Sequence, residues 1–175
     1  FIGLGNLGVH LAAGLLRAGH DVTVHDLDPR ASARLVAAGA SSAGSSRAVA
    51  AAARVVFTCL PSPAAVNAVV SGADGVLDGM QPGGTWIDMS THDRNETLRL
   101  AALAEERGVR VLEAPVTGGV HKAAAGEITV LVGGDESVFE EHRQLLDAVG
   151  SPVLYIGSLG SAAIIKVITN MLAFV

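Results

Sequence analysis

Several features on which large classes of proteins depend are scarce or missing in this sequence. A single cysteine, Cys59, stands among 175 residues, so no internal disulfide can form and nothing indicates a secreted, disulfide-stabilised domain. Aromatic residues make up only 3%, which leaves a core of Ala, Val, Leu and Ile. The formal net charge is −5, whereas neutralising nucleic-acid phosphates takes clustered Lys and Arg. We therefore expect no nucleic-acid partner.

Targeting, membrane and metal signals are missing as well. The first residues lack the basic region and long apolar stretch of a signal peptide, and the apolar run 161–175 is short for a membrane span and contains a lysine. The six histidines show no metal-ligand spacing with one another or with Cys59. We expect a soluble, cytoplasmic protein without a membrane partner or a metal. The chain starts without Met in a strand-like segment and stops within an uncapped helical pattern, so we also expect it to be incomplete at both ends.

What the sequence does contain is an alternation of strand-like and helix-like segments. Near-continuously apolar strands that alternate with helices are typical of an α/β fold, in which a mostly parallel sheet is covered on both faces. The segment 38–46 is interpreted as a loop of small residues, and glycines stand where helices should end, at positions 19, 39, 108 and 150. Strands are predicted at 22–25, 55–59, 85–89, 109–112, 128–132 and 153–156, and helices at about 7–18, 30–38, 63–71, 94–107 and 136–148.

A glycine-rich motif opens the chain. The stretch Gly3-Leu4-Gly5-Asn6-Leu7-Gly8 matches G-x-G-x-x-G between a strand remnant and a helix. In such a motif one glycine makes the tight turn, one admits a pyrophosphate to the backbone, and one lets helix and strand pack closely. A glycine turn without a nucleotide is the alternative interpretation.

An acidic residue follows at the end of the second predicted strand. Asp26 stands eighteen residues beyond Gly8, where a carboxylate can accept hydrogen bonds from the adenosine ribose and repel a 2′-phosphate. This favours NAD over NADP as the cofactor. Arg30 nearby weakens the preference, since an Arg at this place can meet a phosphate.

A second glycine-rich stretch, Thr117-Gly118-Gly119, follows a predicted strand. Its hydroxyl and consecutive unshielded N–H groups can form a nest for a carboxylate. A plain Gly-Gly turn between two strands explains the stretch equally well. Lys122, nearby, can meet an anionic substrate, but a solvated loop position is favoured.

One charge interrupts the apolar helical run near the end of the chain. Lys166 and Asn170 are four residues apart and therefore share one helix face. Apolar residues surround them on all sides, which predicts a buried helix. Burial lowers the pKa of an ammonium, so Lys166 can act as a proton acceptor near neutral pH. A lysine stem that reaches the surface is an equally good interpretation of the residues alone.

Taken together, these motifs resemble the β-hydroxyacid dehydrogenase family, which includes 3-hydroxyisobutyrate dehydrogenase and tartronate semialdehyde reductase, with 6-phosphogluconate dehydrogenase more distant. The resemblance implies a doubly wound, Rossmann-type NAD-binding domain at 1–158. It also implies that 159–175 is the first part of a long helix leading into an all-helical domain, missing here, that usually forms the homo-oligomer. The matching segments are 1–8, 18–22, 59–61, 87–91, 114–119 and 157–170.

The same resemblance implies a role for each motif. Lys166 passes a proton to or from the substrate oxygen during hydride transfer, and Asn170 orients the lysine and the substrate. The substrate carboxylate is held by Thr117, Gly118 and Gly119. The cofactor is bound by Gly3, Gly5, Asn6, Leu7, Gly8, Asp26, Leu60, Pro61 and Thr91.

Two positions depart from the family pattern. Thr169 stands where a second Asn is usual, and His92-Asp93 replaces the usual apolar residue before a proline-containing helix start. The resemblance nevertheless implies an NAD-dependent dehydrogenase of a small 3-hydroxy acid, resembling 3-hydroxyisobutyrate or the reduced form of tartronate semialdehyde. An imine reductase and a non-catalytic nucleotide-binding interaction module are the alternatives, and both usually lack the lysine that this chain has at position 166.

Overall fold

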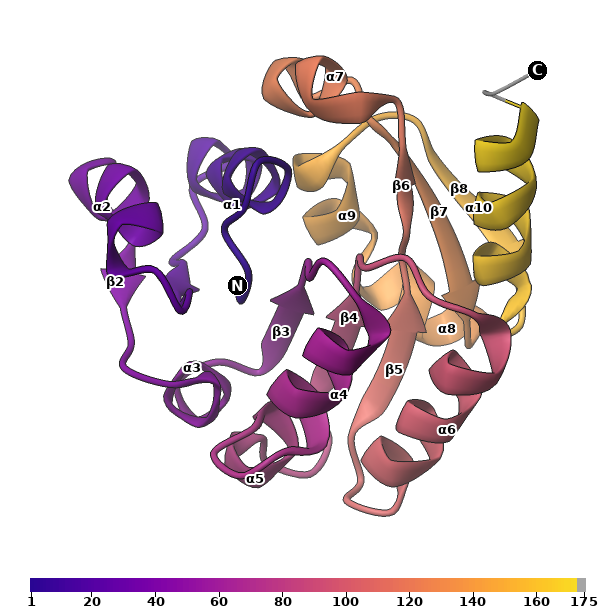
Figure 1. Ribbon diagram of the computed structural model, residues 1–175, viewed down its shortest axis with the longest axis horizontal. Coiled ribbons are helices and arrows are strands. Elements are labelled where there is room, and N and C mark those ends of the chain that lie inside the picture. Colours follow the sequence, from indigo (N-terminus) through magenta and orange to yellow (C-terminus); the bar gives the residue numbers. More distant parts are fainter. Residues whose placement is uncertain (173–175) are drawn as a thin grey trace.

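The computed structural model describes residues 1–172 and has the predicted α/β architecture (Figure 1). The main sheet has the order β3-β4-β5-β7-β6, with β8 beside β7, and a second sheet pairs β1 with β2. Ile2 bridges in parallel to both His25 and Thr58, so the opening segment lies between β1 and β3. The strands are β1 Thr23–Val24, β2 Ser41–Ser42, β3 Val55–Thr58, β4 Thr85–Asp88, β5 Arg110–Glu113, β6 Val116–Thr117, β7 Thr129–Gly134 and β8 Val153–Gly157.

Most strand pairs are parallel, as predicted. The pairs β3–β4, β4–β5, β7–β8 and β1–β2 are parallel, whereas β7 runs antiparallel to both β5 and β6. The carboxyl ends of β3, β4 and β5 point toward the end of the molecule where α7 lies (Figure 1). Ligand sites of open α/β sheets lie outside these strand ends, so this is where a site is expected.

Helices cover both faces of the sheet. Neighbouring residues of one strand enter different cores: Phe57 and Ile87 join one cluster with α1 and α9, while Val56 and Trp86 join another with α4 and α6. None of the helices within residues 1–172 is long and apolar enough to cross a membrane. The helices are α1 Gly8–Arg17, α2 Pro29–Ala37, α3 Ser46–Ala52, α4 Pro63–Ser71, α5 Val76–Gly79, α6 Arg94–Glu105, α7 Gly119–Ala125, α8 Glu136–Glu141, α9 Arg143–Val149 and α10 Ser161–Leu172.

Several details differ from the sequence-based expectation, among them the unpredicted short elements α5, β6 and α7. The predicted loop 38–46 contains β2 and ends at the start of α3, which the Ser45 hydroxyl caps by accepting the N–H of Ala48. The predicted helix 136–148 is two helices that meet at His142, whose buried ring is hydrogen-bonded to Thr85 at 2.8 Å. Gly150 is extended rather than left-handed, and a Cβ there would lie 2.3 Å from the carbonyl oxygen of Ile128. Gly150 follows the last residue of α9, as predicted, but close packing against Ile128 rather than a left-handed turn requires glycine there.

Candidate active site

A cleft of about 590 Å³ lies at the carboxyl ends of the first strands. It is bounded by the glycine loop, the residues after β1 and β3, and one side of α4. Its apolar floor includes Ile2 and Cys59, and the strongly exposed Leu27 stands at its edge. Of the residues predicted to bind the cofactor, those that line this cleft are Gly3, Gly5, Asn6, Leu7, Gly8, Asp26, Leu60 and Pro61.

The three glycines of the loop meet different steric demands. Gly3 has φ +90°, and a Cβ on it would lie 2.3 Å from the carbonyl oxygen of Cys59. A Cβ on Gly8 would lie 2.0 Å from the carbonyl oxygen of Gly3. A Cβ on Gly5 would meet no heavy atom within 4 Å, and this residue is exposed. Gly3 and Gly8 are thus required by the loop itself, while the Gly5 backbone is open to a ligand. This cradle fits a pyrophosphate.

Asp26 is half-buried at the edge of the cleft, where backbone N–H groups hold its carboxylate. Leu4 donates to it at 2.7 Å and Asp28 at 2.9 Å. Arg30 is paired with Asp28 at 3.0 Å, and its hydrogen bond holds the pKa of the Asp28 carboxyl below its usual value. The Arg30 guanidinium is therefore engaged by a neighbouring carboxylate instead of extending toward Asp26.

A second cleft, of about 330 Å³, continues the first toward α7 and α10. The two clefts share Leu7, Cys59, Leu60 and Pro61, so they form one continuous surface. Thr117 is half-buried in β6 and does not line this cleft, although it directly precedes two residues that do. The predicted residues gathered in the second cleft are Leu7, Leu60, Pro61, Thr91, Gly118, Gly119, Lys166 and Asn170.

The Gly118-Gly119 pair joins a strand to a helix. Both residues have positive φ, 133° and 80°, and Gly119 begins α7. The alternative of a plain turn between two strands is therefore wrong, because a short helix follows the pair. Both glycines are exposed toward the cleft, which leaves their backbone accessible.

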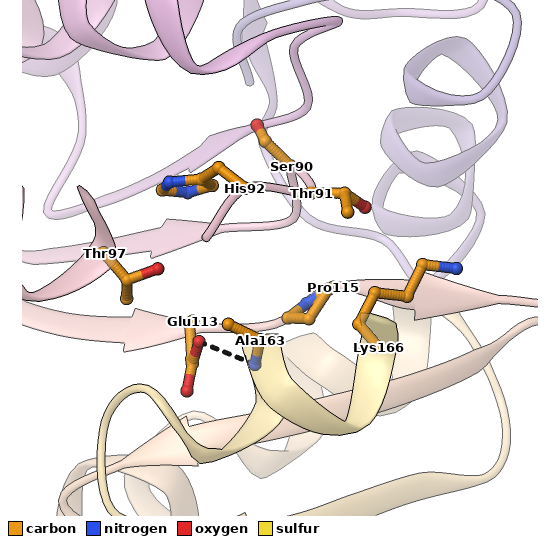
Figure 2. A pocket seen from close by; sticks show the side chains of 8 residues that line it. All are labelled: Ser90, Thr91, His92, Thr97, Glu113, Pro115, Ala163 and Lys166. Atoms are coloured by element: carbon orange, nitrogen blue, oxygen red, sulfur yellow. Dashed lines mark hydrogen bonds between the residues drawn. The ribbon is translucent and has the colours of Figure 1, made fainter. Parts of the chain in front are cut away.

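Lys166 is half-buried, and burial lowers the pKa of its ammonium. Its side chain extends away from Glu113, on the side of Thr91 (Figure 2). The helix around it is less buried than predicted. Only Ala162 and Ala163 are fully buried, because α10 packs on the sheet and α6 through one side alone. Five apolar side chains of α10 are 45–69% exposed, those of Ile164, Val167, Ile168, Met171 and Leu172.

A buried network at the end of β4 was not foreseen. Asp88 accepts hydrogen bonds from the Thr58 hydroxyl at 2.8 Å and the Ser90 N–H at 3.1 Å, and it pairs with His92 Nε2 at 2.5 Å. The Ser90 hydroxyl in turn accepts the N–H of Leu60 at 3.0 Å. The network therefore holds two stretches that line the clefts, 59–61 and 89–91, against each other.

The network shifts the pKa values of its neighbours. Burial acts to lower the pKa of His92, but the hydrogen bond and charge of Asp88, with Glu96 and Asp93, raise it overall. Burial and the Asp88 charge raise the pKa of the Cys59 thiol to about 12, so this cysteine is not a nucleophile near neutral pH. Within residues 1–172, no three His, Cys, Asp or Glu side chains are arranged to hold a metal ion.

A second unforeseen carboxylate lies at the neighbouring strand end. Glu113 is register partner to Asp88 across β4 and β5, and both side chains are 3% exposed. Its oxygens accept the N–H groups of Gly160 at 2.5 Å, Ala162 at 2.9 Å and Ala163 at 3.0 Å. Burial raises the pKa of Glu113, although these three hydrogen bonds oppose the shift. The sequence offers one indication of both residues, because each is a carboxylate at the end of a strand that is predicted to be buried.

Comparison with known proteins places the chain in a family. A family profile described as the NAD binding domain of 6-phosphogluconate dehydrogenase matches residues 1–157. Among curated proteins, 2-(hydroxymethyl)glutarate dehydrogenase of Eubacterium barkeri is 37% identical, over 98% of this chain and 57% of its own length. NAD-dependent L-serine dehydrogenase of Pseudomonas aeruginosa is 40% identical, over 98% of this chain and 58% of its own length. The chain thus spans little more than half the length of these relatives.

A solved structure shows the same relationship. The 3-hydroxyisobutyrate dehydrogenase of Mycobacterium tuberculosis, determined with L-serine, has a TM-score of 0.93 and 36% identity, over 99% of this chain and 58% of that one. The family resemblance and the Rossmann-type fold predicted from the sequence are therefore confirmed. The chain belongs to the family defined by the NAD-binding domain of 6-phosphogluconate dehydrogenase, and its relatives there include 3-hydroxyisobutyrate dehydrogenase.

Proposed function

We propose that this protein is an NAD-dependent dehydrogenase that oxidises a small 3-hydroxy acid and, in reverse, reduces the matching semialdehyde. The observation that carries the proposal is one continuous cleft. The glycine loop lines one end of it, and Lys166 and Asn170 line the other together with Gly118 and Gly119. A dinucleotide, an anion and a proton-transfer group can therefore meet in one place.

The residues of the first cleft fit the cofactor. Gly5 leaves its backbone open for the pyrophosphate, and Asp26 stands where it can accept hydrogen bonds from the ribose hydroxyls. Bound NAD supplies a hydride acceptor at a nicotinamide carbon. NAD is preferred over NADP because the Asp26 carboxylate repels a 2′-phosphate while Asp28 holds Arg30. The remaining proposed cofactor contacts are Gly3, Asn6, Leu7, Gly8, Leu60, Pro61 and Thr91.

Lys166 is the residue that moves the proton in this proposal. Because burial lowers the pKa of Lys166, more of it is neutral near neutral pH than of an exposed lysine. The neutral Nζ takes the hydroxyl proton while the C–H hydride leaves the same substrate, and the ammonium returns that proton during reduction. Asn170, one turn further along α10, orients Nζ and the substrate oxygen.

The substrate carboxylate is assigned to the opposite wall of the second cleft. Gly118 and Gly119 line the cleft and are exposed there, and Thr117, which precedes them in the sequence, is proposed to add its hydroxyl when a substrate binds. L-serine, 3-hydroxyisobutyrate and 2-(hydroxymethyl)glutarate, which appear in the names of the similar proteins, each have a hydroxymethyl group on the carbon next to a carboxylate. An anion site facing a proton acceptor suits that pattern.

The domain organisation of the whole protein is proposed from its membership of this family. We assign residues 1–158 to the cofactor domain and 159–175 to the start of a helix that leads into a helical domain, although the last three of these positions lie outside the residues that the structure describes. The exposed apolar side of α10 supports this assignment, because such a face needs a partner. That domain is proposed to form a homo-oligomer, and the protein to act in the cytoplasm.

The proposal is tested by turnover of the full-length protein on a panel of 3-hydroxy acids, with NAD and NADP compared. In the variant Lys166→Ala, we expect loss of turnover with nearly unchanged NAD binding, measured by calorimetry. The matched control is Lys122→Ala, which removes the other lysine of the chain and should leave turnover intact. Normal turnover in Lys166→Ala would refute the mechanism.

Two other outcomes would identify the alternatives. Reduction of cyclic imines in preference to oxidation of hydroxy acids would indicate an imine reductase. Binding of NAD without turnover on any member of the panel would indicate a nucleotide-binding interaction module.

A further inference from the structure

Glu113 joins the sheet to the first turn of α10. It stands at the end of β5, is 3% exposed, and accepts three hydrogen bonds from the backbone at the start of the helix. Figure 2 shows one of them, from Ala163. The first N–H groups of a helix have no partner within it, and a carboxylate is favoured at this end by the helix dipole. A single side chain thus supplies the acceptors for the first turn of α10.

Room for this carboxylate is made by a residue without a side chain. Gly133 of β7 is the register partner of Glu113 in the antiparallel pair of β5 and β7. A Cβ on Gly133 would lie 2.3 Å from Glu113 Oε1. The contact between β5 and α10 therefore depends on a glycine in a third element, β7.

Glu113 also connects the two parts of the proposed reaction site. It begins the segment that runs through Pro115 to Gly118 and Gly119. On the helix, Lys166 follows the hydrogen-bonded Ala163 by three residues, so the two lie about 60° apart around the axis and about 4.5 Å along it. Glu113, Ala163 and Lys166 line the same enclosed space between α10 and the strand ends (Figure 2).

That enclosed space excludes direct proton transfer by Glu113. The space has no room for a water molecule, and both carboxylate oxygens are occupied by backbone donors. His92 and Thr97 line its other side, and Lys166 extends away from Glu113. Glu113 therefore has no route to the substrate and can act on the reaction only through α10.

We propose that Glu113 is a positioning residue that fixes the rotation of α10 about its axis and its position along that axis, so that Lys166 faces the cleft. This inference rests on the proposed role of Lys166. A slip of one residue in the helix would turn the Lys166 side chain by about 100° and move it by about 1.5 Å along the axis. Either change takes Nζ out of reach of a substrate held at Gly118 and Gly119.

The test is Glu113→Gln in the full-length protein. The amide keeps the size of the side chain but removes its charge and turns a donor toward the N–H of Ala163. We expect kcat to fall about 10- to 100-fold, because misplacement by an ångström has effects of that size. The KM for NAD should stay within about twofold, because Glu113 does not line the cofactor cleft. The matched control is Glu127→Gln, an exposed carboxylate whose loss should change neither quantity.

A second readout does not depend on turnover. An NMR titration of ¹³C-methylated Lys166, assigned with Lys166→Arg, measures the pKa of this lysine directly. In Glu113→Gln that pKa should rise toward the ordinary lysine value, because a displaced Lys166 loses the burial that lowers it. A merely structural role would lower the melting temperature and leave both the pKa of Lys166 and kcat unchanged.

The outcomes separate this inference from the proposed function. No turnover by the unaltered protein refutes the proposed function, while the NMR titration still decides whether Glu113 positions Lys166. Turnover by the unaltered protein with unchanged kcat and unchanged Lys166 pKa in folded Glu113→Gln overturns the inference alone. If Glu113→Gln does not fold, Gly133→Ala displaces the same carboxylate, and unchanged values of both quantities in that variant overturn the inference equally.

Discussion

Replacing Gly8 by alanine is expected to destabilise the fold, whereas replacing Gly5 is expected to weaken only the binding of NAD. A Cβ at position 8 would lie 2.0 Å from the carbonyl oxygen of Gly3, and both residues are buried. A Cβ at position 5 would meet no heavy atom of the protein within 4 Å. The two changes add the same methyl group three positions apart, so they differ only in what surrounds it.

The magnitudes follow from these surroundings. Relieving the contact at position 8 requires a backbone shift, and overpacking of this kind costs about 3 kcal/mol. For a chain of this size that lowers the melting temperature by about 6–12 °C. Gly5 does not have a positive φ, so alanine there should raise stability by about 0.4–1 kcal/mol through the unfolded chain. Losing one hydrogen bond to a charged phosphate, about 1.5–3 kcal/mol, should weaken NAD binding about 10- to 100-fold.

Thermal unfolding followed by circular dichroism and NAD titration by calorimetry measure the two effects on the same samples. Gly44→Ala is the matched control, because a Cβ on Gly44 also meets nothing within 4 Å and this residue does not line the cleft. Like Gly5→Ala it should raise stability slightly, because Gly44 does not have a positive φ either, but it should keep the NAD affinity of the unaltered protein. Equal losses of melting temperature in Gly5→Ala and Gly8→Ala, or unchanged NAD affinity in Gly5→Ala, would refute the assignment of separate roles.

Lys166, Asp26 and His92 each permit a further test. Because burial lowers the pKa of Lys166 below 10.5, the rate of alcohol oxidation should rise with pH and level off below that value; a plateau reached only at an ordinary lysine pKa would contradict this. The same shift favours the neutral amine in the folded state, so the Lys166 contribution to stability should increase as pH rises from its folded pKa to 10.5. Asp26→Asn removes the charge that repels a 2′-phosphate, and the ratio of kcat/KM for NADP to that for NAD should rise at least about tenfold. His92→Ala leaves Asp88 buried without its charged partner and should cost about 3–5 kcal/mol in denaturant unfolding. The pKa of His92 is raised in the folded protein, so the stability that His92 contributes should be complete below pH 6.5 and be lost as pH rises through the folded pKa. If the free energy of unfolding of His92→Ala changes with pH as much as that of the unaltered protein, this reasoning is contradicted.

The elements that were predicted correctly are those with a β-branched apolar run or a helical period. The runs that form β3, β4, β7 and β8 are β-branched and buried on at least one face, and α1 and α6 are amphipathic over ten or more residues. The short helices α3 and α5, of seven and four residues, cover too few turns for a period to show. The helical pattern of 136–148 continues across His142, so the break there leaves no trace in the sequence pattern.

The part of the candidate site that could be predicted is the part whose sequence motif requires a particular backbone geometry. The glycine spacing at 3, 5 and 8 already implies a turn, an open backbone and a close packing contact. The exposure of α10 was not predictable, because an apolar helix gives the same pattern whether or not another part of the protein covers it. Glu113 is a single residue in a buried strand whose partners lie 47 to 50 positions away in the sequence. Asp88 joins local partners, Ser90 and His92, to Thr58, which lies 30 positions away.

The buried network around Asp88 also includes the side chain of Trp86. It is the one tryptophan among these 175 residues, and its indole N–H donates to the Thr58 hydroxyl at 2.9 Å. That hydroxyl donates in turn to Asp88, which pairs with His92. Indole fluorescence responds to its hydrogen bond and to nearby charge, so this chain contains an optical reporter connected to the floor of its cleft. We therefore expect proton uptake at His92, and dinucleotide binding against residues 59–61, to change the emission of this one residue, so that both can be measured without an added label.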